Sequence, residues 1–439
     1  MVSVLIDVVG VVLGSLAFWR VSRSGLDQRS KSIVVVGICV ATALAVFVAS
    51  VRGRQLFPEF RESYYLAGKA VLDGRAALDP LVGVGIDRFV NLPVMAYLFA
   101  PLGLLSESSA AAVFTVVGVA SVVAAWLVTV RLAALEGNRR WLLLFLFCAN
   151  GPLLYSIRLG NTTHMLLLPL ALGLYLLSSR RSLAAGVVLA IAALIKLPLL
   201  LFWPWLLLRR EWRAAAGFGA VWAVACALSL TLFGWDLHAR WLEKTVWPYT
   251  THPIGARNVQ SVPAFFVRLV NEPEVISDYR PIRSPEPLQR LATIVVVGLL
   301  YAGAAAVSSS RRRLRQPRSP TGKDGREWEY LLVLTLAVVT SPLSWSHYYV
   351  LLLLPVAFLL SPRFAGEPWI RRLTWAGCVL ATPAVLNTLH APTALQGLYA
   401  KFLISHLLFA GLILFIALAW ALTRVSGQLP FPARHARPP

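Results

Sequence analysis

The sequence has few charged residues, and acidic residues are the scarcer kind. Only 14% of its 439 residues are charged, and 20 Asp and Glu stand against 41 Lys and Arg. Soluble domains carry about 25% charged and about 45–50% apolar residues. Here the apolar share is 58%. This composition excludes an ordinary soluble domain.

The sequence is also poor in the residues and motifs of metal and nucleotide sites. It has four cysteines, and each lies alone inside an apolar run, which excludes a disulfide framework or a paired-Cys zinc site. It contains no GxxxxGK[ST] loop, no Rossmann-type GxGxxG after a strand, no HExxH and no Asp-x-Asp. We therefore expect no metal, no cofactor and no nucleotide site.

Long apolar runs are what the sequence has instead. A helix needs about 20 mostly apolar residues to cross a bilayer, and we predict an all-α polytopic membrane protein with roughly ten to thirteen transmembrane helices. Residues 1–19 lack a basic leading region and a clear cleavage site, so we expect a retained span or an interfacial helix. The other runs are 33–51, 110–130, 141–157, 163–178, 183–195 continuing through 197–208, 214–233, 291–308, 330–340, 348–361, 373–389 and 402–423.

The net charge of +21 comes largely from short basic loops between these runs. Loops rich in Lys and Arg stay in the cytoplasm, so we interpret the charge as a topology signal and expect no nucleic-acid partner. This rule places 52–92, 234–287 and the turn after 330–340 on the extracytoplasmic side. Residues 93–105 are too short to span comfortably. They form a re-entrant or surface helix, or the orientation is off by one span there.

The same features divide the chain into three parts. Residues 1–32 form an N-terminal span and a cytoplasmic basic loop. Residues 33–361 form the main transmembrane domain, with outer loops 52–92 and 234–287 and a cytoplasmic basic loop at 309–328. Residues 362–439 form C-terminal spans and a basic cytoplasmic tail.

Charged side chains gather just past one of the first spans, in LFPEFRESYYLAGKAVLDGRAALDP (56–80). One interpretation is a juxtamembrane helix with solvated charges. The other is a catalytic carboxylate, because a carboxylate at a low-dielectric boundary has a raised pKa that suits a general base. We predict that 56–80 forms short surface helices over a lipid-facing groove.

Three further segments place polar groups among apolar ones. SPLSWSHYYVLLLLP (341–355) holds Ser344, Trp345 and His347 at a membrane face, where polar groups are costly and usually functional. Lys196 in ALIKLPLLLFWPW is either a lysine that snorkels at a span end or a ligand of an anion such as a lipid phosphate. The remaining candidates are Arg257 and Asn258 in GARNVQSVPAFF, and Arg158 and Asn161 in RLGNTTHML; both pairs are also compatible with ordinary solvated positions.

The order of these segments resembles glycosyltransferase family 87, of the GT-C superfamily. The series is EFRESYYLAGKAVLDG, NLPVMAYLFAPLG, the Gly-Asn of RLGNTTHML, IKLPLLL, LLLRREWRAA, RNVQS and SPLSWSHYY, over about residues 55–360. The resemblance implies a membrane enzyme that transfers mannose or arabinofuranose from a polyprenyl-phosphate sugar. The sequence departs from the family pattern at Asn91-Leu92-Pro93 and at Gly160-Asn161-Thr162-Thr163, which bears on the sugar and the acceptor more than on the reaction.

The resemblance also implies site residues. The family's presumed base is typically an Asp followed by Phe and, about five residues on, by Tyr. Here Glu59 stands in place of that Asp, ahead of Phe60 and Tyr64, and Glu62 is the competing acid. Lys196 and Arg257 are then expected at the donor phosphate. The remaining predicted catalytic or substrate-binding residues are His347, Arg158, Asn161, Asn258, Ser344 and Trp345.

The predicted partners are a polyprenyl-phosphate sugar donor, a glycolipid or polysaccharide acceptor, and membrane lipids. We expect a multi-pass protein of the cell membrane with its active site facing outward. A transporter or flippase of a lipid-linked sugar is the alternative, although the sequence has no evident internal repeat.

Overall fold

The computed structural model describes residues 2–51, 54–86, 88–313, 325–362, 367–383 and 395–425, and the regular secondary structure of this part of the chain is helical apart from one isolated β-bridge. Five of its helices are long and apolar enough to cross a membrane: Gln28–Val51, Glu107–Leu132, Trp212–Thr251, Pro287–Ser309 and Gln396–Arg424. The adjacent helices Asn138–Cys148 and Gly151–Leu159 meet at a bend of 46°, and they add a sixth candidate span if the pair is taken as one. The prediction of an all-α polytopic membrane protein is confirmed.

Shorter apolar helices lie between these candidate spans. They are Thr162–Ser178, Ser182–Ile195, Leu197–Leu208 and Ser346–Leu359. Each is shorter than the about 20 residues that a straight crossing needs. Our count of roughly ten to thirteen spans included these runs, which explains why it exceeds the number of long helices. The predicted run 373–389 extends into residues outside the described part.

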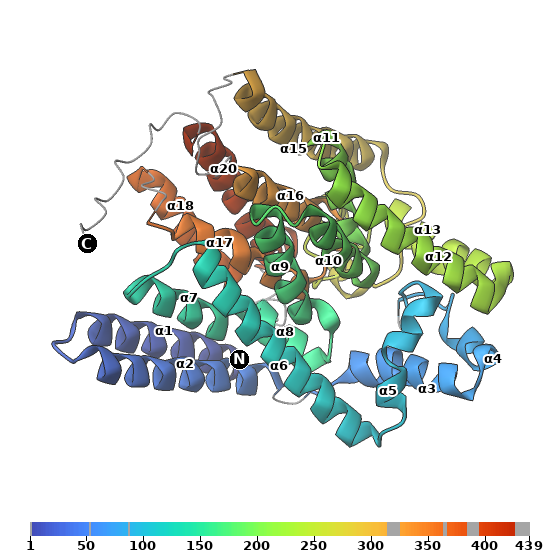
Figure 1. Cartoon of the computed structure of the whole chain (residues 1–439), viewed down its shortest axis with the longest axis horizontal. Coiled ribbons are helices and arrows are strands. Elements are labelled where there is room, and N and C mark those ends of the chain that lie inside the picture. Colours follow the sequence, from blue (N-terminus) through green and yellow to red (C-terminus); the bar gives the residue numbers. More distant parts are fainter. Residues whose placement is uncertain are drawn as a thin grey trace, which may run out of the picture.

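The N-terminal helices form a hairpin at one side of the molecule. Helices α1 (Val2–Arg23) and α2 (Gln28–Val51) lie side by side at the lower left of Figure 1. They pack on α7 (Asn138–Cys148), where the rings of Phe18 and Phe145 are 5.5 Å apart. After α2 the chain leaves the hairpin and enters the loop that carries Glu59.

The central bundle depends on close contact between helices, and α10 and α12 show how the sequence allows it. A Cβ atom at Gly186 would collide with the backbone of Ala214, and one at Gly217 with the carbonyl of Leu183. Small residues let helix backbones approach closely in membranes. The bundle helices are α6 (Glu107–Leu132), α8 (Gly151–Leu159), α9 (Leu167–Ser178), α10 (Ser182–Ile195), α11 (Phe202–Leu208), α12 (Trp212–Trp241), α14 (Val262–Val270), α15 (Pro287–Arg313), α16 (Arg326–Thr340), α17 (Leu353–Leu359), α18 (Pro368–Ala381), α19 (Gln396–Lys401) and α20 (His406–Val425).

The first large loop consists of short helices, as predicted. It contains a π-helical turn, Phe60–Tyr65, followed by α3 (Leu66–Asp73), α4 (Arg75–Leu78) and a 3-10 turn, Asp79–Leu81. In Figure 1 α3, α4 and α5 lie together at the right. Residues 93–105 form a 3-10 helix, Pro93–Leu98, and α5 (Ala100–Gly103), which are far too short to span.

Helix α12 connects this loop to the bundle. Gly234 has φ of 75°, which bends the helix before its last turns. The bend lets Trp241 donate a hydrogen bond from Nε1 to the carbonyl of Val90, 3.0 Å away. Further along, the chain forms a second π-helical turn, Leu242–Val246, and α13 (Trp247–Thr251). Both π-helical turns border the large cavity described next, and such turns often mark functional sites.

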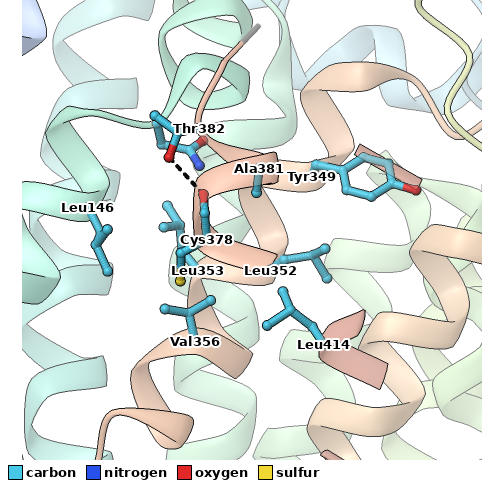
Figure 2. Close-up of a pocket in the computed structure, with 10 residues that line it drawn as sticks. Leu146, Tyr349, Leu352, Leu353, Val356, Cys378, Ala381, Thr382 and Leu414 are labelled. Carbon is cyan, nitrogen blue, oxygen red and sulfur yellow. Dashed lines mark hydrogen bonds between the residues drawn. The ribbon is translucent and has the colours of Figure 1, made fainter. Parts of the chain in front are cut away.

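A small void between α7, α17, α18 and α20 contrasts with that cavity (Figure 2). Its volume is about 10 Å³, and leucine, valine and alanine side chains form most of its wall. Thr382 donates its hydroxyl to the carbonyl of Cys378 within its own helical turn, and the hydroxyl of Tyr349 points away from the void. With no charged residue in its wall, this void is a packing gap.

Candidate active site

A cavity of about 860 Å³ lies where the first loop, the α10–α11 break, α12 and residues 341–348 meet. Most of the residues predicted for the site form its wall, although they come from five separate stretches of sequence. Arg158, Arg257 and Ser344 do not. The predicted residues in the wall are Glu59, Glu62, Tyr64, Asn161, Lys196, Asn258, Trp345 and His347.

Glu59 directly precedes the π-helical turn of the first loop, and its neighbours fix it in place. Phe60 is fully buried and its ring lies 4.8 Å from that of Phe114 on α6. Phe57, with a positive φ of 58°, donates its amide to the carbonyl of Arg158 at 2.8 Å. The glutamate is thereby held between an aromatic anchor and the end of α8.

Asn161 binds Glu59 from the opposite side. Its Nδ2 donates to Oε2 of Glu59, while its Oδ1 accepts from the amide and hydroxyl of Thr163 at 2.8 and 2.6 Å. Gly160 ends α8 in the left-handed conformation with φ of 67°, and a Cβ there would collide with Phe60. The Gly-Asn pair thus allows the close approach and supplies the donor.

The surroundings of Glu59 make it a better candidate for a general base than Glu62. Burial raises the pKa of its carboxyl, and the charge of Lys196, the hydrogen bond from Asn161 and the charge of Arg158 partly offset that rise. A raised pKa strengthens a carboxylate as a proton acceptor. Glu62 also borders the cavity, but it is exposed to solvent.

Lys196 occupies the break between α10 and the 3-10 helix Leu197–Leu201, which Pro198 helps to create. It is only 8% exposed, and its Nζ lies 5.1 Å from the ring centroid of Tyr348. It forms no ion pair with any described carboxylate. Asn91 stabilises the break by donating to the carbonyls of Leu194 and Ile195, at 3.3 and 2.8 Å.

Two segments that are far apart in sequence pair beside the cavity. Val259 and Trp345 form an antiparallel bridge, in which the amide of Gln260 donates to the carbonyl of Ser344 at 2.6 Å. The amide of Ser346 donates to the carbonyl of Asn258 at 2.7 Å. This pairing explains why Ser344 is fully buried behind the wall while its neighbours face the cavity.

His347 lies in the second of these segments, and its buried ring has an unusual environment. It is 2% exposed, borders the cavity, and neither ring nitrogen has a hydrogen-bond partner within the described residues. Its ring lies 5.1 Å from that of Tyr348 and 6.3 Å from that of Tyr155. Buried polar atoms normally have partners, so these nitrogens are available to a bound molecule.

Arg268, which the sequence analysis did not predict, supports the cavity wall from behind. The side chain is 1% exposed and donates to the carbonyls of Gly255, Ala256 and Val259 at 3.3, 3.2 and 2.9 Å. It also donates to Ser405 at 3.0 Å. A single arginine in the apolar helix VPAFFVRLV is the signal that would have indicated it. Tyr279, which stacks on Trp345, carried no such signal.

The described residues contain no group of three or more His, Cys, Asp or Glu side chains arranged to hold a metal ion. The cavity wall instead contains the half-buried carboxylate of Glu59 and the buried ammonium of Lys196, with the exposed charges of Glu62 and Arg88, amides, hydroxyls and several aromatic rings. Such a wall is suited to bind a polar, partly anionic substrate next to an apolar one.

These features define a multi-pass membrane protein with a large polar cavity between its helices. A family model, glycosyltransferase family 87, matches residues 89–342, which is more than half of the chain. The chain therefore belongs to this family and is a membrane glycosyltransferase. Curated proteins and solved structures give no match. Lys196, Asn161 and Asn258 lie inside the matched range, whereas Glu59 and His347 lie outside it.

Proposed function

We propose that the protein transfers a single sugar, mannose or arabinofuranose, from a polyprenyl-phosphate donor to a hydroxyl of a glycolipid or glycan acceptor. The observation that carries the proposal is the cavity, which brings Glu59 and Lys196 to one space with both charges free of ion pairs among the described residues. A carboxylate base and a fixed cation are the two groups that this transfer requires.

In the proposed reaction, Glu59 accepts the proton of the acceptor hydroxyl as its oxygen attacks the anomeric carbon. The bond from that carbon to the phosphate oxygen breaks, and polyprenyl phosphate leaves with the electron pair. Lys196 stabilises the charge that develops on the leaving phosphate. Asn161 orients Glu59 through its hydrogen bond, and the wall around Asn258 and His347 supplies contacts for the sugar.

The wall of the cavity toward α15 and α16 supports a lipid donor. Trp222, Leu200, Tyr301 and Ala337 border the cavity there. Helix α15 packs loosely against the rest of the protein, since only 6% of its most apolar 18-residue stretch is buried. An apolar polyprenyl chain can lie along such a lipid-facing surface, because both are as apolar as the bilayer, which would place its phosphate near Lys196.

We further propose that the cavity faces the extracytoplasmic side of the cell membrane. The support is the charge pattern, because the basic turns at 139–140, 180–181 and 209–213 connect helices at the ends remote from Lys196. Polyprenyl-phosphate sugars need no nucleotide for transfer, which agrees with the lack of nucleotide motifs.

The test is transfer by the purified full chain in lipid nanodiscs, with polyprenyl-phosphate mannose or arabinofuranose labelled in the sugar. We expect labelled product and free polyprenyl phosphate from one of these donors, and neither from GDP-mannose. In sealed vesicles, movement of intact donor between leaflets without release of polyprenyl phosphate would instead identify a flippase and overturn the proposal.

A further inference from the structure

Two stacked aromatic rings lie in the cavity wall, and the transfer proposed above gives them no role. The rings of Tyr279 and Trp345 are nearly parallel, with their centroids 6.4 Å apart and their planes at 19° to each other. Both side chains border the cavity. Tyr279 is 37% exposed and Trp345 is half-buried. Part of this aromatic pair is therefore accessible to a molecule in the cavity.

The aromatic pair lies at one end of the cavity, which we call the loop end. Trp345 packs with Ile86 of the first loop and Tyr249 of α13 on one small apolar cluster, and all three border the cavity. Arg88, also from the first loop, borders it with an exposed side chain. The loop end thus combines aromatic rings with polar groups, whereas the wall toward α15 and α16 is mostly apolar.

Hydrogen bonds between distant segments fix the backbone that carries the two rings. The stretch around Tyr279 is held at both ends, because the amides of Arg257 and Ile282 donate to the carbonyls of Ile276 and Pro253 at 2.9 and 3.0 Å. The second ring is fixed by the antiparallel bridge described above. A surface that is already ordered loses little conformational entropy when a ligand binds to it.

A buried polar atom without a partner lies beside the aromatic pair. Asn258 belongs to the segment that pairs with Trp345, and its carbonyl accepts from the amide of Ser346 at 2.7 Å. Its side-chain Oδ1 is buried and accepts no hydrogen bond from the described residues, although Asn258 borders the cavity. Buried polar atoms normally have partners. A ligand at the loop end should therefore offer both an apolar face and a hydrogen-bond donor.

We propose that Tyr279 and Trp345 form an acceptor subsite, which binds a sugar ring next to the sugar that is glycosylated. One face of a sugar ring carries C–H groups that pack on the negative face of an aromatic ring, and its hydroxyls can donate to Oδ1 of Asn258. This proposal rests on the proposed transfer and deepens it. The acceptor then contains at least two sugars, and the enzyme extends a glycan rather than adding the first sugar to a lipid.

The first test measures sugar binding without donor, so it does not depend on transfer. The full chain in phosphatidylcholine nanodiscs is titrated with α-linked mannotriose or arabinofuranotriose, and saturation-transfer NMR follows the ring C–H protons. One of the two trisaccharides should bind. Tyr279→Leu should weaken its binding about tenfold, because apolar contact with the ring is lost. Tyr279→Phe keeps the ring and should bind as the wild type does.

The matched control is Trp247→Leu, because Trp247 is a 66% exposed aromatic residue of α13 that does not border the cavity. It should leave the affinity for the trisaccharide unchanged, whereas Trp345→Leu should weaken binding about as much as Tyr279→Leu does. Equal affinity of Tyr279→Leu and the wild type would overturn the subsite. Failure of both trisaccharides to bind the wild type would overturn it as well.

The second test compares acceptors of one and two sugars in transfer from the labelled donor. The wild type should have a KM for the disaccharide about tenfold below that for the methyl monosaccharide. Tyr279→Leu should remove this difference while the KM for donor stays unchanged.

A higher KM for donor in Tyr279→Leu, with the preference for the disaccharide intact, would assign the rings to the donor's sugar and overturn the acceptor subsite. Equal KM values for both acceptors in the wild type would overturn it too. Absence of any product would count against the proposed function instead, and the NMR titration would still decide whether the rings bind a sugar.

Discussion

Two clusters of charged residues lie within the helical bundle, and they differ in how their charges are compensated. At the ends of α11, α12 and α16, Arg209 lies 2.8 Å from Glu329, and Arg326 lies 2.7 Å from Glu211. Around the cavity, Glu59 and Lys196 are close enough to alter the pKa of Glu59, yet they form no ion pair. One cluster is neutralised by its own side chains and the other is not.

The difference indicates what each cluster does. Glu329 is 1% exposed, and a carboxylate that is buried this deeply is tolerated when a cation compensates it. Those pairs connect helices distant in sequence and need no ligand. The cavity charges are removed from water without a direct ion pair, which is expected where a substrate supplies the missing partner. Substitutions in the two clusters should therefore affect different quantities.

The largest expected effect is at Glu59. Glu59→Gln keeps the size of the side chain and removes the proton acceptor, so transfer should fall by about 10²–10⁴-fold, the usual loss for a general base. Glu59→Asp should retain part of the activity. The measurement is single-turnover transfer from the lipid-phosphate donor.

Glu62→Gln is the matched control, since Glu62 also borders the cavity but is exposed. Its rate should stay close to that of the wild type. A near-normal rate for Glu59→Gln would remove Glu59 from the mechanism. If Glu62→Gln were the inactive variant, the role of base would pass to Glu62.

Lys196→Gln should have the next largest effect, because the leaving phosphate gains charge in the transition state. We expect about a 10²-fold loss of turnover together with a higher donor requirement. Unfolding temperature in detergent should change little, since Lys196 forms no ion pair with described residues. If donor dependence and turnover both stayed normal, the phosphate would have to bind elsewhere.

Arg209→Gln, in the neutralised cluster, should show the opposite pattern. It leaves the Glu329 carboxylate without its cation, and we expect a loss of about 2 kcal/mol in stability, less than for a fully buried pair because Arg209 is 18% exposed. Thermal unfolding measures the loss, and the donor requirement of the folded protein should be unchanged. An altered donor requirement with normal stability would contradict the division between the two clusters.

The sequence predicts much of this arrangement but not its contacts. Apolar runs predict the membrane helices, and polar residues inside such runs indicate Lys196 and His347. The pairing of Val259 with Trp345 was not predictable, because a single bridge between distant segments leaves no periodic pattern. Asn91 appeared only as a departure from the family pattern, whereas in the structure it stabilises the helix break before Lys196. Local patterns report burial, and contacts between distant segments depend on the packing of the whole bundle.

The smallest expected effect concerns the pH dependence of transfer. Glu59 must be ionised to accept a proton, and because burial raises its pKa above the ordinary value of 4.5, the rate should fall with decreasing pH at a higher pH than an exposed glutamate would give. Asn161→Ala removes a hydrogen bond that stabilises the carboxylate, so this acid limb should move to still higher pH. Lys196→Gln should move it in the same direction and further, since its charge lowers the pKa of Glu59 more than that hydrogen bond does. Glu62→Gln should leave the limb in place. Rates across a pH series, measured at saturating donor, would contradict this account of the base if the limb of Asn161→Ala stayed unmoved or shifted to lower pH.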